Sequence, residues 1–277
     1  MFRHLIYIAL LTLALVFLMF RPYMPGSYDQ LAVTISAMVQ IGSYGGLLLI
    51  LVGGIWLLSR PGEPGAERRN ENFWKASLIV IGLLVIIVSL IPLAGDNPSF
   101  ATLFLVVSLA LIARSWMRTK EPYASASTPA APLYLILIPL IVVAVRVTFI
   151  DKAVEYSRNL AIRNSEALIQ EIENHFERYG RYPISLQALH GDISPGVVGI
   201  KEYCYEPYGE AYNVYFKHSS QDLAADEIVM YNKRDEHAFA SHRLDILEYT
   251  GNELALRRGD RRRVQLSTPH WMAISFD

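Results

Sequence analysis

Hydrophobic residues are concentrated in the first 150 residues, in runs long enough to form membrane-spanning helices. The five runs are Leu5–Phe20, Leu31–Leu58, Ser77–Ala94, Ser99–Trp116 and Pro132–Ile150. A helix needs about 20 apolar residues to cross about 30 Å of hydrocarbon, and each run approaches that length. The first run ends in Phe20-Arg21-Pro22-Tyr23 without a small-residue cleavage site, so we interpret it as a retained span and not as a signal peptide. The pattern predicts a multi-pass α-helical domain of about five spans, residues 1–150, in a lipid bilayer.

The pattern changes after residue 150. Helix-favouring residues continue from Asp151 to Tyr179 without Gly or Pro, and one apolar stripe runs along them at helical spacing. The stripe consists of Ala161, Leu168, Ile172, Phe176 and Tyr179. A stripe of this kind needs a partner surface, and the strand-like segments that follow would supply it.

Short alternating segments in the last 75 residues predict an antiparallel sheet. Residues 203–206 and 212–217 flank Pro207-Tyr208-Gly209-Glu210 and predict a hairpin. Further strands are predicted at 227–232, 245–249, 253–257 and 271–276, with a turn at Thr250-Gly251-Asn252. We therefore expect residues 151–277 to form a soluble α+β domain in which a long helix packs on the sheet.

Basic residues are distributed unequally among the loops between the predicted spans. Eight fall on one side of a five-span threading, namely Arg3, Arg60, Arg68, Arg69, Lys75, Arg114, Arg118 and Lys120, whereas the other side holds only Arg21. Because positive loops stay in the cytoplasm, this bias predicts a cytoplasmic N-terminus and, after an odd number of crossings, a periplasmic or extracellular C-terminal domain. For a bacterial chain the membrane would be the inner membrane.

Charge also limits the function classes. The chain has 52% hydrophobic and 18% charged residues; residues 151–277 hold 15 Lys and Arg against 20 Asp and Glu. A mildly acidic soluble half offers no broad positive surface, so we expect no nucleic-acid binding. Cys204 is the one cysteine, which excludes an internal disulfide and is typical of a small apolar filler.

The end of the predicted long helix resembles a known family. The segment Tyr179-Gly180-Arg181-Tyr182-Pro183-Ile184-Ser185-Leu186, between an amphipathic helix and a small antiparallel sheet, is similar to type IV pilins and type II secretion pseudopilins. The resemblance covers about 40 residues. It implies a pilin-like fold and a structural role without an active site. The family's prepilin leader and the glutamate that follows it have no counterpart at the last span.

Polar residues are rare within the predicted spans. Apart from Arg114, which is counted with the loop that follows its run, Arg146 is the only charged one, close enough to the outer end of its span for the side chain to snorkel to the headgroups. Gln40 and Tyr44 are expected to hydrogen-bond neighbouring helices. Gly42 and Gly46 have the spacing that lets two helices approach closely, either within the bundle or in self-association of two chains. Proton-coupled or ion-coupled transport is disfavoured.

One histidine-rich segment is a candidate metal site. Asp235-Glu236-His237 is followed by His242 and Asp245, and these side chain types bind zinc. The sequence lacks the established zinc motifs, and it also lacks a nucleophile elbow, a phosphate-binding loop and a dinucleotide fingerprint. The other interpretation is a polar loop whose side chains cap turns. The basic run Arg257–Arg263 is interpreted as a solvated turn or as a contact for anionic lipid or an acidic partner.

These observations favour a non-enzymatic membrane protein without a cofactor, which displays an extracytoplasmic binding, sensing or assembly module. The candidate contact surface is a strip of alternating tyrosines, Tyr203, Tyr205, Tyr208, Tyr212 and Tyr215, although such residues also stabilise sheets. The alternatives are a membrane-anchored metal-dependent enzyme using His237, His242 and Asp245, and a passive channel or transporter through the spans.

Overall fold

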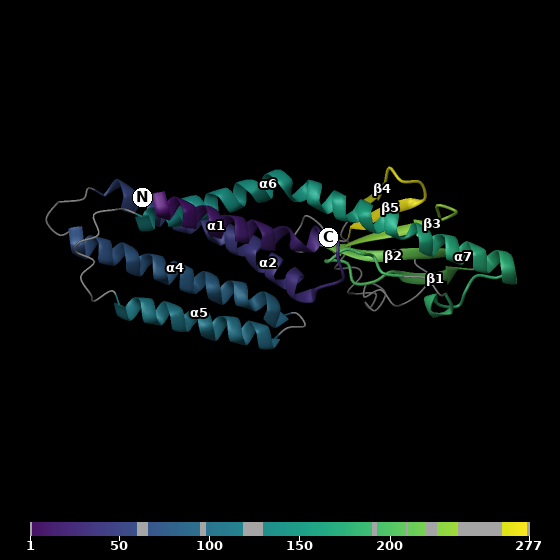
Figure 1. The fold of residues 1–277 in the computed structure, drawn as a ribbon, viewed down its shortest axis with the longest axis horizontal. Coiled ribbons are helices and arrows are strands. Elements are labelled where there is room, and N and C mark those ends of the chain that lie inside the picture. Colours follow the sequence, from purple (N-terminus) through teal and green to yellow (C-terminus); the bar gives the residue numbers. More distant parts are fainter. Residues whose placement is uncertain are drawn as a thin grey trace, which may run out of the picture. The chain divides into compact units, whose positions relative to one another are not determined.

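The chain forms two compact units in a computed structural model that describes residues 2–59, 66–94, 98–118, 130–189, 193–208, 210–219, 226–237 and 262–275 (Figure 1). The helical unit contains Met1–Arg21 and Gln30–Ile150. The sheet unit contains Asp151–Asp277 together with Pro22–Asp29, a segment that we call the strap. The sequence pattern gave no indication that the strap belongs with the C-terminal residues.

The helical unit is built from long apolar helices, as predicted. They are α1 (Phe2–Phe20), α2 (Gln30–Gly45), α3 (Leu47–Leu58), α4 (Ala66–Ala94), α5 (Pro98–Arg118) and the first part of α6 (Ala130–Asn164), and the turn η1 (Arg21–Tyr23) follows α1. Among the described residues, four helices are long and apolar enough to cross a membrane. The pair α2 and α3, bent by 43°, makes a fifth if it counts as one span. The single run predicted at 31–58 is therefore two helices with a break at Gly46.

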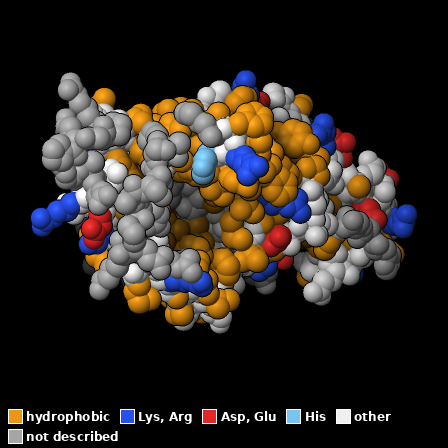
Figure 2. Space-filling model, turned by 60° about the vertical axis from the view of Figure 1, so that its left-hand side comes forward, with side chains coloured by type: hydrophobic (Ala, Val, Ile, Leu, Met, Phe, Trp, Pro, Cys, Tyr) orange, Lys and Arg blue, Asp and Glu red, His pale blue; other side chains and the backbone are white. Residues whose placement is uncertain are grey.

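The helices of this unit expose apolar side chains. Leu13, Leu51 and Leu103 are 66%, 64% and 64% exposed, and hydrophobic side chains cover a broad area in Figure 2. Water does not solvate such faces favourably, whereas hydrocarbon does. The exposed faces are those expected of helices surrounded by lipid.

Glycines allow the helices of this unit to approach one another. A Cβ atom added at Gly42 would lie 3.5 Å from Val88 of α4, and one at Gly46 would lie 3.1 Å from Cβ of Pro139 in α6. Both glycines thus face helices of the same chain, which corresponds to the bundle-packing interpretation of their spacing.

The helix beyond residue 150 continues as the sequence predicts. α6 extends to Asn164, and after Ser165 it is followed by α7 (Glu166–Tyr179). Gly180 ends α7 with φ of 67°, a left-handed conformation that glycine adopts without strain, and its N–H donates to the Phe176 carbonyl. Of the predicted stripe, Ala161, Leu168 and Ile172 are buried, whereas Phe176 and Tyr179 are 39% and 65% exposed.

The sheet is antiparallel, with strand order β1-β2-β3-β5-β4. Its strands are β1 (Cys204–Tyr208), β2 (Ala211–Ser219), β3 (Asp226–Asn232), β4 (Arg262–Gln265) and β5 (Trp271–Ser275), and a short turn, η3 (Leu186–Ala188), precedes them. The hairpin and the strands predicted at 227–232 and 271–276 are confirmed. The strands predicted at 245–249 and 253–257 and the turn at 250–252 lie outside the described residues. β4 was not predicted, because its Arg262 and Arg263 had been assigned to a solvated turn.

The core of the sheet unit lies between the helix and one face of the sheet. β2 directs Tyr212, Val214 and Phe216 to this side, where they pack with Leu168 and Ile172 of α7. The opposite face buries Tyr215, Ile228 and Met230. The predicted long helix on an antiparallel sheet is confirmed for the described residues.

Adjacent glycines of α3 allow a matched test of the helical unit. A Cβ added at Gly53 would lie 2.9 Å from Ile136 and 3.1 Å from the Pro132 carbonyl oxygen, whereas one at Gly54 meets nothing within 4 Å. We expect Gly53→Ala to lower the free energy of unfolding by about 1–3 kcal/mol through overpacking. Gly54→Ala should leave it unchanged or slightly raised. Thermal unfolding of the detergent-solubilised chain measures both, and equal midpoints would contradict this packing.

Candidate functional site

The strap pairs with the segment 196–199 of the sheet unit through the backbone. Pro25 and Val197 form an antiparallel bridge. Four hydrogen bonds accompany it: Gly26 N to Gly196 O at 3.0 Å, Asp29 N to Val198 O at 3.0 Å, Val198 N to Met24 O at 3.0 Å and Gly199 N to Pro22 O at 2.7 Å. Val197 and Val198 are buried. The strap is therefore an integral part of the sheet unit, joined to it by an isolated bridge and the hydrogen bonds around it.

Gly199 makes the close approach of the strap possible. A Cβ added there would lie 2.8 Å from the carbonyl oxygen and 3.0 Å from Cβ of Pro22. These contacts are closer than side chains tolerate against a backbone. A residue with a side chain at 199 would push the strap away.

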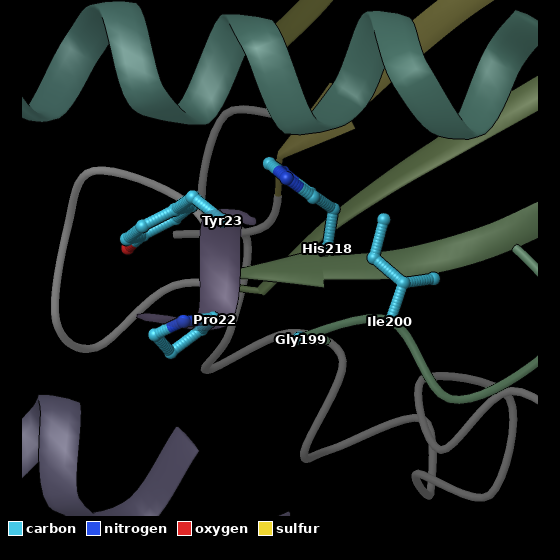
Figure 3. A pocket seen from close by; sticks show the side chains of 5 residues that line it. All are labelled: Pro22, Tyr23, Gly199, Ile200 and His218. Carbon is cyan, nitrogen blue, oxygen red and sulfur yellow. The ribbon is translucent and has the colours of Figure 1, made fainter. Parts of the chain in front are cut away.

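The strap covers a small cavity that contains one titratable ring. The lining residues are Pro22, Tyr23, Gly199, Ile200 and His218 (Figure 3). The cavity volume is about 10 Å³, which is room for about one water molecule. His218 is only 3% exposed, and in Figure 3 its ring extends from β2 toward α6.

The hydrogen bonds of His218 define its protonation. Nε2 lies 2.8 Å from Oγ of Ser157, and the Ser157 hydroxyl donates to the Val154 carbonyl at 2.9 Å. Because the Ser157 hydroxyl proton is donated to that carbonyl, the Nε2–H group of the histidine donates to Oγ, and Nδ1 is the unprotonated ring nitrogen. Nδ1 is buried and has no hydrogen-bond partner among the described residues.

A largely buried ion pair lies next to this histidine. Arg158 of α6 donates from Nη2 to Oε2 of Glu227 at 2.8 Å, and its Nε lies 2.7 Å from Oε1. Glu227 is the cross-strand partner of His218, and both residues are at the edge of the helix-facing core. Burial raises the pKa of Glu227, against the opposing effect of Arg158.

Burial and the Arg158 charge together lower the pKa of His218 to about 3. The ring is therefore neutral at physiological pH. Ser157 is fully buried and its hydroxyl donates to a main-chain carbonyl. A nucleophilic serine must be reached by its substrate, so Ser157 is not available as a nucleophile in this conformation.

The predicted tyrosine strip is largely buried where the structure describes its side chains. Tyr203, Tyr212 and Tyr215 are 5%, 0% and 3% exposed. Tyr205 donates to the Pro183 carbonyl and Tyr212 to Glu173, both at 2.9 Å. Burial raises the pKa of both tyrosines, which stay protonated. These residues stabilise the sheet, the alternative that the alternating pattern had left open; the environment of the Tyr208 side chain is outside the described residues.

The predicted metal residues are only partly described. His242 and Asp245 lie outside the described residues. His237 is buried, and its Nε2 lies 3.1 Å from the His270 carbonyl oxygen. Asp235 contacts Nδ1 of His270 at 3.2 Å. No group of three metal-binding side chains occurs among the described residues.

Asp235, His237 and His270 share an unusual backbone conformation. Their φ angles are 57°, 33° and 66°, and they are the non-glycine residues with positive φ in the described part of the chain. Such conformations cost about 1–3 kcal/mol each and need surrounding contacts to hold them. Here Asn232 contributes, because its N–H donates to the His270 carbonyl and its Oδ1 accepts from Arg234 N.

Arg146 lies inside the helical unit and does not snorkel. It is 6% exposed, its Nε donates to Oε1 of Gln40 at 3.1 Å, and its guanidinium hydrogen-bonds the Tyr44 hydroxyl and stacks over that ring. The expectation that Gln40 and Tyr44 join neighbouring helices is thus confirmed. The snorkelling interpretation is wrong because these two side chains bind the guanidinium within the bundle.

Sequence reasoning missed the strap and His218. The strap has no hydrophobic periodicity, and its partner is distant in the sequence. His218 had a usable indication, since it continues the inward-facing series Tyr212, Val214 and Phe216 at period two. A histidine at an inward strand position predicts a buried ring.

The ion pair of Arg158 and Glu227 can be tested by substitution. We expect Arg158→Met to lower the free energy of unfolding by about 3–5 kcal/mol, because it leaves the Glu227 carboxylate buried without its cation. The double variant Arg158→Met, Glu227→Leu should recover most of this loss. Urea titration of the detergent-solubilised chain, followed by fluorescence, measures both. Equal destabilisation of the single and double variants would show that the pair is not coupled.

No family model, curated protein or solved structure matched this chain in the comparisons with known proteins.

Proposed function

We propose that this chain is a non-enzymatic multi-pass membrane protein. It displays the sheet unit, which includes the strap, outside the cytoplasm as a binding, sensing or assembly module. The observation that carries the proposal is the pairing of the strap with residues 196–199. The strap connects α1 to α2, and segments that hydrogen-bond through their backbones must lie on one side of a membrane.

The strap therefore limits the number of crossings. Since Asp29 and Asp151 share one side, the chain between them crosses the bilayer an even number of times. The bent pair α2 and α3 counted as one span gives four crossings together with α4, α5 and α6, whereas a re-entrant pair gives three. The strap thus favours the bent pair as a full crossing and supports five spans in total.

The distribution of basic residues supports the sidedness. In the five-span threading the short connections on the strap side carry Arg21 alone, and the opposite side carries eight Lys and Arg residues. The positive-inside rule then assigns the strap and the sheet unit to the periplasm or the cell exterior. A hydrocarbon environment for the helical unit agrees with its exposed leucines.

The pilin resemblance adds a proposal about the module itself. A long helix packed on an antiparallel sheet, with Gly180 left-handed at the end of the helix, supports a pilin-like arrangement. Subunits of that kind act through contacts with other proteins. A role in assembly or recognition is consistent with it.

Cysteine labelling tests the sidedness. In a Cys204→Ser background, we expect Ser27→Cys in the strap and Lys201→Cys in the sheet unit to react with a membrane-impermeant maleimide in intact cells, because both positions are exposed and proposed to be outside. Arg68→Cys, also exposed, should react only after permeabilisation. Labelling of Ser27→Cys without Lys201→Cys would overturn the strap pairing, and protection of both would reverse the orientation.

Metal analysis separates this proposal from the enzyme alternative. We expect the purified full chain to contain only trace transition metal, because His237 Nε2 is directed at a carbonyl oxygen. A His237→Ala, His242→Ala variant serves as the control and should give the same value. About one zinc per chain, lost in that variant, would instead support the metal-dependent enzyme.

A further inference from the structure

We propose that His218 is a proton-binding site that controls the strap: the neutral ring permits docking, and protonation releases the strap from residues 196–199. The sheet unit is then an acid-responsive sensing module. This inference rests on the proposed function in one respect, namely that the sheet unit faces a compartment whose pH varies. The release itself depends only on the geometry of the sheet unit.

The cavity couples the ring to the strap. Two of its five lining residues, Pro22 and Tyr23, belong to the strap. Gly199 is the last residue of the segment that pairs with the strap, and Ile200 follows it directly. A cavity with room for about one water cannot hydrate a charged imidazolium, which needs several water molecules or an anion. Opening the strap removes one wall of the cavity and lets water reach the His218 ring.

The groups around His218 oppose a positive charge in the docked state. α6 contributes Ser157, which occupies Nε2, and Arg158, whose charge repels a proton. β3 contributes Glu227, whose carboxylate is held by Arg158. From β2 the Phe216 ring lies 6.4 Å from the imidazole, and the strap contributes Tyr23. The docked state therefore favours the neutral ring.

The direction of the pH effect follows from linkage. Burial lowers the pKa of His218 to about 3 in the docked state, whereas a solvated imidazole has a pKa of about 6.5. Between these values the open state binds a proton that the docked state does not. Docking is therefore strongest above pH 6.5 and weakens as the pH falls from 6.5 toward 3. From pH 7.5 to pH 5 the ratio of open to docked strap should rise about 30-fold.

The position of the strap in the chain gives the release a consequence. η1 directly follows α1, and Gln30, which begins α2, directly follows the strap. Docking restrains both connections through the backbone bonds of Gly26, Asp29, Val198 and Gly199. Release of the strap removes that restraint from the α1–α2 connection, so a change in proton concentration is converted into a change in the mobility of a loop between two helices.

Hydrogen exchange of the full chain in lipid nanodiscs tests the inference. At pH 7.5 and pH 5.0, with times corrected for the intrinsic pH dependence of exchange, we expect protection of Gly26, Asp29, Val198 and Gly199 amides to fall about 30-fold at the lower pH. Amides of the β2–β3 ladder should keep their protection. His218→Gln should lose the pH response, and His175→Gln, which alters a half-buried ring on α7, should retain it.

A second variant keeps the test decisive if His218→Gln does not fold. Gly199→Ala places a Cβ against Pro22, so the strap amides should exchange rapidly at both pH values while the β2–β3 ladder stays protected. The inference is overturned if the parent shows no pH response, if His218→Gln responds like the parent, or if Gly199→Ala keeps a protected strap. Because exchange in nanodiscs does not depend on orientation, the cysteine labelling distinguishes a failure of the sidedness from a failure of the proton site.

Discussion

Four backbone hydrogen bonds between the strap and residues 196–199 constrain more of this chain than any side-chain contact does. They join two segments that are remote in the sequence, one before α2 and the other after α6. A backbone pairing of this kind satisfies polar groups that would otherwise need water, and its two segments cannot be divided between the two sides of a bilayer. It therefore defines the content of the sheet unit and, in the proposed membrane topology, limits the threading of the helices.

The strap also lines a cavity with His218, one member of a buried polar layer at one end of the core. The layer consists of Ser157 and Arg158 of α6, His218 of β2 and Glu227 of β3. His218 continues the inward-facing series Tyr212, Val214 and Phe216 along β2. Ser157 is hydrogen-bonded to Nε2 of His218, and Arg158 is hydrogen-bonded to Glu227. Nδ1 of His218 is buried without a partner among the described residues, and the ring lines the cavity next to the strap. Burying apolar side chains at these positions would cost less free energy than burying this polar layer. Its presence at the strap is the physical reason to connect it with docking.

Local sequence patterns predicted much of the fold, because most elements depend on near neighbours. The long helix to Tyr179 was predictable from its stripe, and the hairpin at 204–219 from alternation around Pro207. The break at Gly46 was not predictable, since the pattern of a continuous apolar run does not distinguish the residue at which the helix bends. β4 was hidden by Arg262 and Arg263, which are compatible with an edge strand as well as with a turn.

The candidate site was less accessible to sequence reasoning. Tyrosines at alternating positions suit both a recognition surface and a sheet core, and only the side of the sheet that the helix covers decides between them. Tyr212 is fully buried because α7 lies over it and Glu173 accepts its hydroxyl proton. His218 was one of six histidines in the C-terminal half, and its distinction comes from the non-local contacts with Ser157 and the strap cavity.

The bent pair α2 and α3 gains significance from the threading that the strap favours. If the pair crosses the bilayer, its break lies within the helical unit, where unsatisfied backbone groups are costly. Gly46 N donates to Gly42 O at 2.8 Å and Leu49 N to Gly46 O at 2.9 Å, so the backbone near the break stays largely bonded. Gly46 packs against Pro139 of α6, and Arg146 of the same helix binds Gln40 and Tyr44 just before the break. Because α6 continues to Ser157 and Arg158, one helix carries both the residues that support the break and those that surround His218.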